Sequence, residues 1–171
     1  MIIETKRTKI RKLKYRDWQD LAVIFADFEQ SSYRDYDAKM PLDPFGVKLV
    51  IGIDLLVGGY YTVLRKEDDA MLGYISTLGI FQKEIGYAFK QRFQGQGYAL
   101  EAVEGVLAYL HEEKGYDRFK AVAALENKPS VRLLDRLGFT MVKTRQMYLR
   151  MDRQGRPLMF TAGVYQKEVG Q

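Results

Sequence analysis

Two glycines, Gly95 and Gly97, separate a strand-like segment from a helix-like one in the run Arg92-Phe93-Gln94-Gly95-Gln96-Gly97-Tyr98-Ala99. Glycine has no Cβ, so the backbone can approach an anion closely there. A helix that begins directly behind such a turn offers unpaired N–H groups and the positive end of its dipole. Arg92 adds a fixed positive charge suited to phosphate oxygens. We therefore predict that this segment binds a phosphate-bearing cofactor.

Two familiar phosphate-binding loops do not match this segment. The P-loop requires Gly-x-x-x-x-Gly-Lys followed by Ser or Thr, and the chain contains no such run. The dinucleotide fingerprint requires a third small residue where this chain has Leu100, whose bulk would obstruct close packing between helix and strand. Neither nucleotide-binding interpretation fits.

The pattern of apolar residues predicts the elements that hold this loop in place. Alternating and buried-type runs indicate strands, a period of 3.6 residues indicates helices, and Gly or Pro marks their ends. The predicted strands are residues 8–14, 60–65, 70–79, 82–89, 118–125, 139–151 and 157–166. The predicted helices are residues 17–28, 42–56, 97–114 and 130–137, with an irregular segment over 29–46. This order predicts a single α/β domain over residues 1–171, layered around a mixed sheet.

The composition excludes several classes of site. The 171 residues include no cysteine and one histidine, His111. Disulfides, thiolate metal sites and cysteine nucleophiles are therefore absent, and a histidine-based zinc site or a Ser-His-Asp triad is not expected. The longest apolar stretch, residues 49–59, is interrupted by Asp54 and is too short to span a bilayer. The start of the chain has no apolar signal core, so we expect a cytoplasmic protein that contacts no membrane and uses no metal.

The chain is basic, with a formal net charge of +5 and a pI of about 9.3. Much of this charge lies within residues 6–16, which carry Lys6, Arg7, Lys9, Arg11, Lys12, Lys14 and Arg16. One interpretation is a solvated edge strand that its charges protect from pairing with other chains. The alternative is a contact with nucleic acid or the ribosome.

Signatures elsewhere in the chain identify a family. The loop continues as Tyr98-Ala99-Leu100-Glu101-Ala102, and residues 127–139 read Asn-x-x-Ser, a helix and Gly-Phe. With residues 84–87 and 7–11, these segments resemble the GNAT acetyltransferases, particularly the branch that modifies the N-termini of ribosomal proteins. The resemblance implies a mixed, mostly antiparallel sheet of about seven strands with helices on both faces. It also implies transfer of an acetyl group from acetyl-CoA directly to a primary amine.

The resemblance further implies which residues hold acetyl-CoA. The strand over residues 85–89 would diverge from its neighbour and leave backbone groups free for the pantetheine arm, with the N–H of Tyr87 or Ala88 near the thioester oxygen. Asn127 would bond to the pantetheine amide or order the loop before the helix. The predicted cofactor-binding residues are Tyr87, Ala88, Phe89, Arg92, Gln94, Gly95, Gln96, Gly97, Tyr98, Ala99 and Asn127.

Proton transfer is where this chain departs from much of the superfamily. Many members carry a tyrosine four residues after the position of Ser130, as the acid that protonates the leaving thiolate, and here that position is Leu134. Ser130 is the remaining candidate acid, although its hydroxyl could equally serve only as a helix cap. Glu84 is the candidate general base, with a surface or ion-paired carboxylate as the alternative.

The sequence leaves the amine acceptor open between a protein N-terminus such as that of a ribosomal protein, a peptide and a small molecule. An α-amino group has a pKa near 8 and a lysine side chain one of about 10.4, so a site without a strong base suits an α-amine or a weakly basic small molecule. Aromatic side chains that could line the acceptor pocket, or pack in the core, are Phe28, Tyr33, Tyr36 and Phe45. Asp35 and Asp37 could attract a cationic amine.

Two other functions stay open on the sequence alone. Leu134 is compatible with a non-catalytic, acyl-CoA-binding regulatory module, because it cannot donate a proton. The basic segment is compatible with an RNA- or ribosome-binding domain. A homodimer through the C-terminal hairpin is a further hypothesis.

Overall fold

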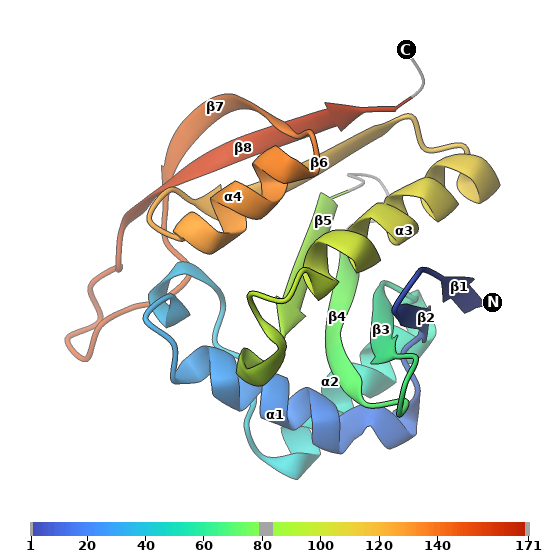
Figure 1. Ribbon diagram of the computed structural model, residues 1–171. Coiled ribbons are helices and arrows are strands. Elements are labelled where there is room, and N and C mark those ends of the chain that lie inside the picture. The colour runs from blue at the N-terminus through green and yellow to red at the C-terminus, as the bar shows by residue number, and fades with distance from the viewer. Residues whose placement is uncertain (1, 79–83, 170–171) are drawn as a thin grey trace.

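An eight-stranded mixed sheet forms the centre of the computed structural model, which describes residues 2–78 and 84–169 (Figure 1). The strands lie in the order β1-β2-β3-β4-β5-β6-β8-β7, and every neighbouring pair is antiparallel except β5 and β6. Their bounds are β1 Ile2–Glu4, β2 Thr8–Lys12, β3 Tyr60–Arg65, β4 Met71–Leu78, β5 Glu84–Phe89, β6 Arg118–Ala124, β7 Thr140–Met147 and β8 Phe160–Glu168. The expected mixed, mostly antiparallel sheet is confirmed. Residue 79 of the predicted strand 70–79 and residues 82–83 of the predicted strand 82–89 lie outside the described residues.

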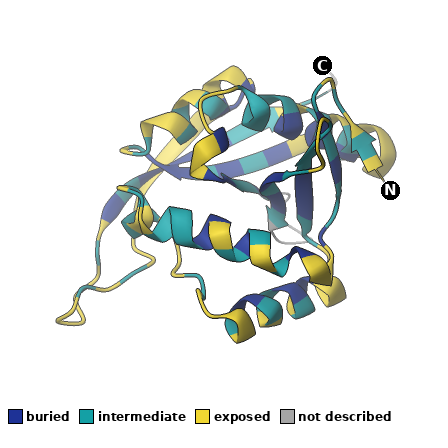
Figure 2. Cartoon of the chain, turned by 60° about the horizontal axis from the view of Figure 1, so that its bottom comes forward, coloured by how far each residue is buried: buried dark blue, intermediate teal, exposed yellow. Residues whose placement is uncertain are grey.

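Helices cover both faces of this sheet, as the family resemblance implied. Their bounds are α1 Trp18–Glu29, α2 Pro44–Val57, α3 Tyr98–Lys114 and α4 Lys128–Arg136, with short 3-10 turns at Tyr15–Asp17, Arg34–Tyr36 and Gln91–Phe93. Apolar residues of α3 and α4, such as Val103 and Leu134, share one buried cluster with the sheet. Residues of α1 and α2, such as Leu21 and Ile51, form a second cluster on the other face. Figure 2 shows buried positions on the helix sides that face the strands.

The strand that the sequence did not predict is β1. Its three residues are too few to show an alternating pattern, and they pair with β2 so that Ile3 lies opposite Ile10. Since β1 occupies the outer side of β2, the basic segment does not form the edge of the sheet. The expectation of a charged edge strand is therefore wrong, and β1 and β7 are the edges of this sheet.

Local capping explains where two helices begin. Helix α2 starts at Pro44, whose missing N–H costs nothing at the first helical position, and the Asp43 side chain accepts the N–H of Gly46 at 2.9 Å. Helix α4 begins two residues before its predicted start, because the Asn127 side chain accepts the N–H of Ser130 at 3.3 Å. Helix α3 ends as predicted at Gly115, which has a positive φ of 64°.

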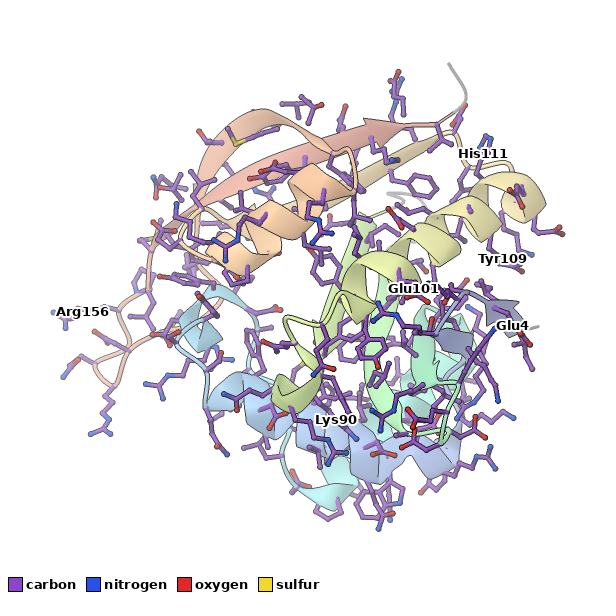
Figure 3. The ribbon with its side chains drawn as sticks, in the orientation of Figure 1. Glu4, Lys90, Glu101, Tyr109, His111 and Arg156 are labelled. Atoms are coloured by element: carbon purple, nitrogen blue, oxygen red, sulfur yellow. The ribbon has the colours of Figure 1, made fainter. Side chains whose placement is uncertain are left out.

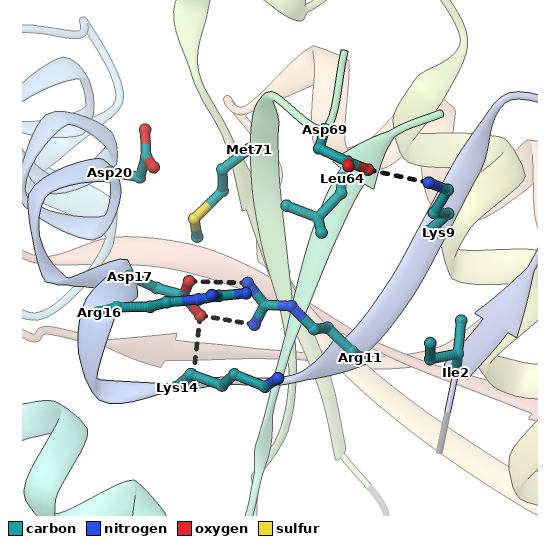
Figure 4. A pocket seen from close by; sticks show the side chains of 10 residues that line it. All are labelled: Ile2, Lys9, Arg11, Lys14, Arg16, Asp17, Asp20, Leu64, Asp69 and Met71. Carbon is teal, nitrogen blue, oxygen red and sulfur yellow. Dashed lines mark hydrogen bonds and ion pairs between the residues drawn. The ribbon is translucent and has the colours of Figure 1, made fainter. Parts of the chain in front are cut away.

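A buried ion pair joins β2 to the start of α1 (Figure 4). The Arg11 guanidinium donates to both carboxylate oxygens of Asp17, at 2.7 and 2.8 Å, and the Lys14 N–H and Thr62 hydroxyl donate to the same carboxylate. Asp17 precedes α1 but makes no side-chain cap bond, so its predicted capping role is replaced by this pair. A hollow of about 490 Å³, lined by both charged and apolar side chains, lies beside the pair, between β2 and the first turn of α1.

Internal partners account for most of the basic segment. Three of its cations form ion pairs, namely Arg7 with Glu101, Lys9 with Asp69, and Arg11 with Asp17. The Lys12 ammonium lies 3.9 Å from the centre of the Tyr61 ring. These charges serve the fold, and they give the nucleic-acid interpretation little support.

Candidate functional site

The parallel strands β5 and β6 touch at one end and then diverge. Among the described residues their register holds a single pair, Glu84 opposite Lys120, whereas all of β5 pairs with β4, from Leu78–Glu84 to Gly73–Phe89. The predicted divergence is therefore confirmed. The strands form a wedge that is closed at Glu84 and open at the carboxyl end of β5, where the backbone edge of β5 has no strand beside it.

Hydrogen-bond alternation decides which amides of β5 face the wedge. The N–H of Lys90 bonds to the carbonyl oxygen of Leu72 on β4 at 2.8 Å. In an antiparallel pair every second residue makes such bonds, so the N–H of Ala88 also points toward β4, and the N–H of Tyr87 points into the wedge. A Cβ built at Gly73 would lie 2.4 Å from the carbonyl oxygen of Ala88, in agreement with that orientation. Of the two predicted oxyanion donors, the geometry favours Tyr87.

The loop after β5 presents an amide cradle at the open end of the wedge. Gly95 and Gly97 have positive φ angles of 73° and 80°, which glycine adopts without strain. The first intrahelical bond of α3 runs from the N–H of Glu101 to the carbonyl of Gly97, so the amides of residues 98–100 precede the helical ladder. A Cβ at Gly95 would meet nothing within 4 Å, which leaves the cradle open to a ligand. This chemistry fits the pyrophosphate of coenzyme A.

Side chains fix the cradle by binding its carbonyl groups. Gln94 donates from Nε2 to the carbonyl of Phe89 at 2.8 Å, and Gln96 donates from Nε2 to the carbonyl of Arg92 at 2.9 Å. Arg7 donates from Nη1 to the carbonyl of Gln96 at 3.0 Å. With these carbonyls occupied, the loop offers mainly N–H groups to an anion. The two glutamines thus have an internal role that the sequence did not reveal.

Two guanidinium groups flank the cradle. Arg92 is exposed and lies 4.7 Å from the centre of the Phe93 ring. Arg7 lies 4.4 Å from the centre of the Tyr98 ring, and its Nη2 atom would be 3.3 Å from a Cβ at Gly97. Sequence reasoning placed Arg7 in the basic segment and in the family resemblance over residues 7–11, but not at the cradle, because 90 positions separate it from Gly97 and no local pattern links them.

Glu101, labelled in Figure 3, holds Arg7 in this place. Its carboxylate accepts hydrogen bonds from the Arg7 backbone N–H, from Arg7 Nε at 2.7 Å and from the Thr5 hydroxyl. Burial opposes ionisation of Glu101, but these donors outweigh it and lower its pKa below the usual value. The first turn of α3 is therefore tied to the segment between β1 and β2.

Helix α1 holds the same loop from the opposite face of the sheet. The buried Lys90 ammonium, labelled in Figure 3, binds the Asp20 carboxylate, and the backbone N–H of Gln91 donates to Asp27 at 2.8 Å. Because α1 also packs against the sheet, these contacts set where the chain leaves β5. The cradle is consequently fixed by both helical layers.

A pair of hydroxyl groups lies beside the wedge on the α4 side. The Tyr87 hydroxyl lies 3.0 Å from the Ser130 Oγ atom, so a β5 side chain reaches the first turns of α4. Burial raises the pKa of Tyr87 to about 12, although the bond to Ser130 works against that rise. Asn127 supplies the cap of α4, which leaves the Ser130 hydroxyl free for Tyr87. Sequence reasoning used only the backbone of Tyr87 and missed this pairing.

Other predicted residues occupy separate positions. Glu84 lies at the closed end of the wedge, and strand alternation places its side chain on the α1/α2 face, opposite to Tyr87. Leu134 is fully buried in the core cluster, so the usual position of the family's acid is part of the core here. His111 lies toward the far end of α3 from Glu101 and contacts the carbonyl of Tyr116, away from the cradle.

The segment between α1 and α2 crosses the α1/α2 face of the wedge. The Tyr36 ring packs at 5.4 Å against Phe160 of β8. On the other side, burial raises the pKa of Tyr60, and the nearby charges of Asp54 and Asp37 raise it further. Tyr36 therefore packs beside β8, and Asp37 lies within electrostatic range of Tyr60 on β3.

The carboxyl group of Asp37, in this segment, has a raised pKa. The residue is exposed to solvent, yet surrounding protein atoms desolvate the carboxyl group and raise its pKa, against the opposing effects of the Ala38 N–H and Arg150. Arg150, from the connection between β7 and β8, binds the carbonyls of Asp37 and Ala38 and both carboxylate oxygens of Glu29. Arg150 thereby locks this segment to α1. Phe45, predicted to join the other aromatic residues here, lies instead on the outward face of α2.

The described residues hold no cluster of three or more His, Cys, Asp or Glu that could bind a metal ion. Within the same part of the chain, no helix is both long enough and apolar enough to cross a bilayer.

Replacing Gly97 should abolish acetyl-CoA binding. Valine in the left-handed region is strained, and its Cβ would press on Arg7. In thermal unfolding, acetyl-CoA at a hundred times its dissociation constant should stabilise the native chain by about 2.7 kcal/mol, and Gly97→Val should lose this shift. Gly155→Val is the control, because Gly155 has a φ of 75° and a Cβ there would meet nothing within 4 Å. A full ligand shift in Gly97→Val would contradict the cradle assignment.

Comparison with known proteins yields one consistent set of matches. The sequence matches the family described as acetyltransferase (GNAT) domain over residues 7–140. An uncharacterized N-acetyltransferase of Bacillus subtilis (strain 168) is 28% identical over 142 residues, covering 81% of this chain and 82% of that protein. The ribosomal protein uS5-alanine N-acetyltransferase of Escherichia coli (strain K12) is 35% identical over 78 residues, 46% of this chain and 40% of that protein. The structure of a ribosomal-protein alpha-N-acetyltransferase in complex with coenzyme A superposes with a TM-score of 0.81 and 17% identity, covering 99% of this chain and 98% of that chain.

Proposed function

This chain belongs to the GNAT acetyltransferase family and is an acetyl-CoA-dependent N-acetyltransferase, and we propose that its acceptor is the α-amino group of a protein or peptide. The observation that carries this choice of acceptor is Asp37, an exposed residue with a partly desolvated carboxyl group on the α1/α2 face of the sheet, the face that also carries Glu84. Two of the proteins compared above are named for acetylating ribosomal proteins, which supports the same class.

Binding of acetyl-CoA falls to the wedge and the cradle. When bound, acetyl-CoA supplies the activated acetyl group as a thioester. The Gln94 N–H is occupied by the carbonyl of Gln91 at 3.1 Å, so the amides of residues 95–99 would hold the pyrophosphate, with Arg92 and Arg7 contributing positive charge at the rim. The Tyr87 N–H would donate to the thioester oxygen as negative charge develops on it. The Nδ2 group of Asn127 remains a donor for the pantetheine arm, because Oδ1 is used in the helix cap.

The reaction forms a C–N bond and breaks a C–S bond, so one proton must leave the amine and one must reach the sulfur. Glu84 would receive the amine proton, directly or through water, on the acceptor side of the wedge. Ser130 would deliver a proton to the thiolate from the α4 side, with the Tyr87 hydroxyl orienting it. An α-amine with a pKa near 8 is partly neutral at physiological pH, so one modest carboxylate base suffices.

Acceptor class can be tested with three sets of amines, with acetylation read by mass spectrometry. One set has peptides with free N-termini and no lysine, the second has N-terminally blocked peptides with one lysine, and the third has small-molecule amines. We expect acetyl transfer to the free N-termini. Transfer confined to lysine or to small amines would overturn the acceptor assignment. Tight acetyl-CoA binding without any transfer would favour the regulatory-module alternative.

Asp37→Asn should weaken recognition of the amine while sparing acetyl-CoA. Loss of a carboxylate facing an ammonium group should raise the KM for the acceptor roughly tenfold, with the KM for acetyl-CoA unchanged. Because the pKa of Asp37 is raised, its charge is lost as pH falls through that raised value, so the native acceptor KM should rise at acidic pH. Asp35→Asn is the matched control, since Asp35 pairs loosely with Arg34 at 3.6 Å. Equal effects of the two variants would remove Asp37 from the proposed site.

A further inference from the structure

Helix α2 is apolar on the side that faces away from the protein. Val47 and Ile51 are buried against the sheet layer. The opposite side carries Phe45, Leu49, Ile53 and Leu56, which are 79%, 54%, 54% and 89% exposed. Their spacing places all four on one face of a helix, and exposed positions recur along α2 in the burial colouring of Figure 2. We call these four residues the α2 stripe.

The α2 stripe reaches the upper end of the apolar surface that a monomer usually exposes. Single exposed apolar residues are ordinary, but four large side chains on adjacent turns form one continuous patch. With the neighbouring exposed residues Leu55 and Val57, the patch offers on the order of 600 Å² of apolar surface, the upper end for monomeric proteins. A standard protein interface buries roughly 800 Å² per partner. The patch therefore supplies most of what one side of a stable dimer needs.

Charge points to a second copy of the chain as the occupant. The only charged residues of α2 are Lys48 and Asp54. The Lys48 ammonium lies 4.4 Å from the centre of the Trp18 ring, and the buried Asp54 accepts the N–H groups of Gly59 and Tyr60. The stripe itself carries no charge, so two copies can meet without repulsion. A membrane surface is disfavoured, because helices that lie on bilayers carry a row of basic residues beside the apolar face.

The shape of the stripe also suits self-association. Gly52 lies among the stripe residues, and a Cβ built there would meet nothing within 4 Å. This leaves a shallow gap into which a side chain of a facing helix can fit. In a two-fold dimer the same patch must serve both partners. The α2 stripe meets this requirement, because its projecting side chains can fit the gap at Gly52 of the other copy and it carries no charge.

We propose that this chain forms a homodimer in which the α2 stripes of two copies pack together across a two-fold axis. The proposal is independent of the acceptor and of the proton-transfer residues. It also replaces the C-terminal hairpin as the expected interface. A charge placed on the stripe would appear twice in the interface, so a single substitution should separate the subunits.

The first test is the mass in solution, measured by light scattering and by sedimentation across a wide range of protein concentration. We expect the native chain to have twice the 19.8 kDa of one copy, and Leu56→Lys to halve that mass. Two controls are Val23→Lys, at an exposed apolar position of α1, and Met151→Lys, in the hairpin connection. Both should remain dimeric. Retention of the acetyl-CoA thermal shift in Leu56→Lys would show that the variant is folded.

Cross-linking provides the second test, because the chain has no cysteine of its own. Gly52→Cys should be joined to its own copy by a short bis-maleimide, and Val23→Cys should not. A native chain that is monomeric at every concentration would overturn the proposal. Binding of such a monomer to lipid vesicles would instead assign the α2 stripe to a membrane surface. A dimer that survives Leu56→Lys but is lost in Met151→Lys would place the interface at the hairpin and would also overturn the proposal.

Discussion

Removal of the Ser130 hydroxyl should slow acetyl transfer about a hundredfold while leaving acetyl-CoA affinity intact. Proton transfer by a positioned side chain contributes at least about that factor, and Leu134 cannot substitute because it is buried in the core. Ser130→Ala should therefore lower kcat, with an unchanged KM for acetyl-CoA. The measurement is steady-state transfer to a free α-amine, together with the thermal shift given by acetyl-CoA.

The Tyr87 hydroxyl should act through Ser130 and not in parallel with it. Tyr87→Phe removes the bonds of this hydroxyl to the Oγ atom and the carbonyl oxygen of Ser130. We expect a smaller loss in kcat, and the double variant should be no slower than Ser130→Ala alone. The pKa of Tyr87 is about 12, so this hydroxyl keeps its proton throughout the neutral range and should add no step to the pH profile there. Unchanged kcat in both single variants would remove the hydroxyl pair from catalysis, whereas additive losses would make Tyr87 an independent donor.

Asp17→Ala should destabilise the fold by about 3–5 kcal/mol, because it leaves the Arg11 guanidinium nearly buried without its partner. Burial opposes ionisation of Asp17, but hydrogen bonds from Arg11, Lys14 and Thr62 outweigh it and lower the pKa of Asp17. The stabilising contribution is therefore complete above the unfolded pKa of about 3.9 and is lost as pH falls through the lower folded pKa. Denaturant unfolding at neutral and acidic pH measures both effects.

Asp152→Ala is the matched control for this prediction. Asp152 also pairs with an arginine, at 2.7 Å, but the Arg156 side chain in that pair is exposed to solvent. The denaturation midpoint should hardly change at neutral pH, since exposed ion pairs contribute little. If both aspartate variants lost the same stability, burial of the Arg11–Asp17 pair would not be the cause.

Local signals in the sequence were sufficient for most of the fold. Seven strands and the four helices were predicted from periodicity and from end signals such as Gly115. The missing strand, β1, has too few residues for a pattern of its own, and only its pairing with β2 defines it. That omission also produced the wrong edge assignment for the basic segment. Both errors have one cause, since strand neighbours in a sheet are determined by contacts distant in sequence.

In the candidate site, too, features set by neighbouring residues were predictable and features set by distant contacts were not. The cradle was predictable because Gly95, Gly97 and the following helix are adjacent in sequence, and local geometry requires glycine there. The contributions of Arg7 and of the Tyr87 hydroxyl were not predictable, because each depends on a partner from another part of the chain. The buried position of Leu134 likewise follows from packing and not from its neighbours in sequence.

The bond network of Glu101 has a consequence for the order in which the protein matures. The carboxylate at the start of α3 receives its donors from Thr5 and Arg7, more than ninety positions earlier. Contacts of such sequence separation form late, because a long loop must first close. During synthesis, the opening residues must therefore wait for the middle of the chain before the cradle takes its final shape. Acquisition of coenzyme affinity should therefore mark the docking of the segment that carries Thr5 and Arg7.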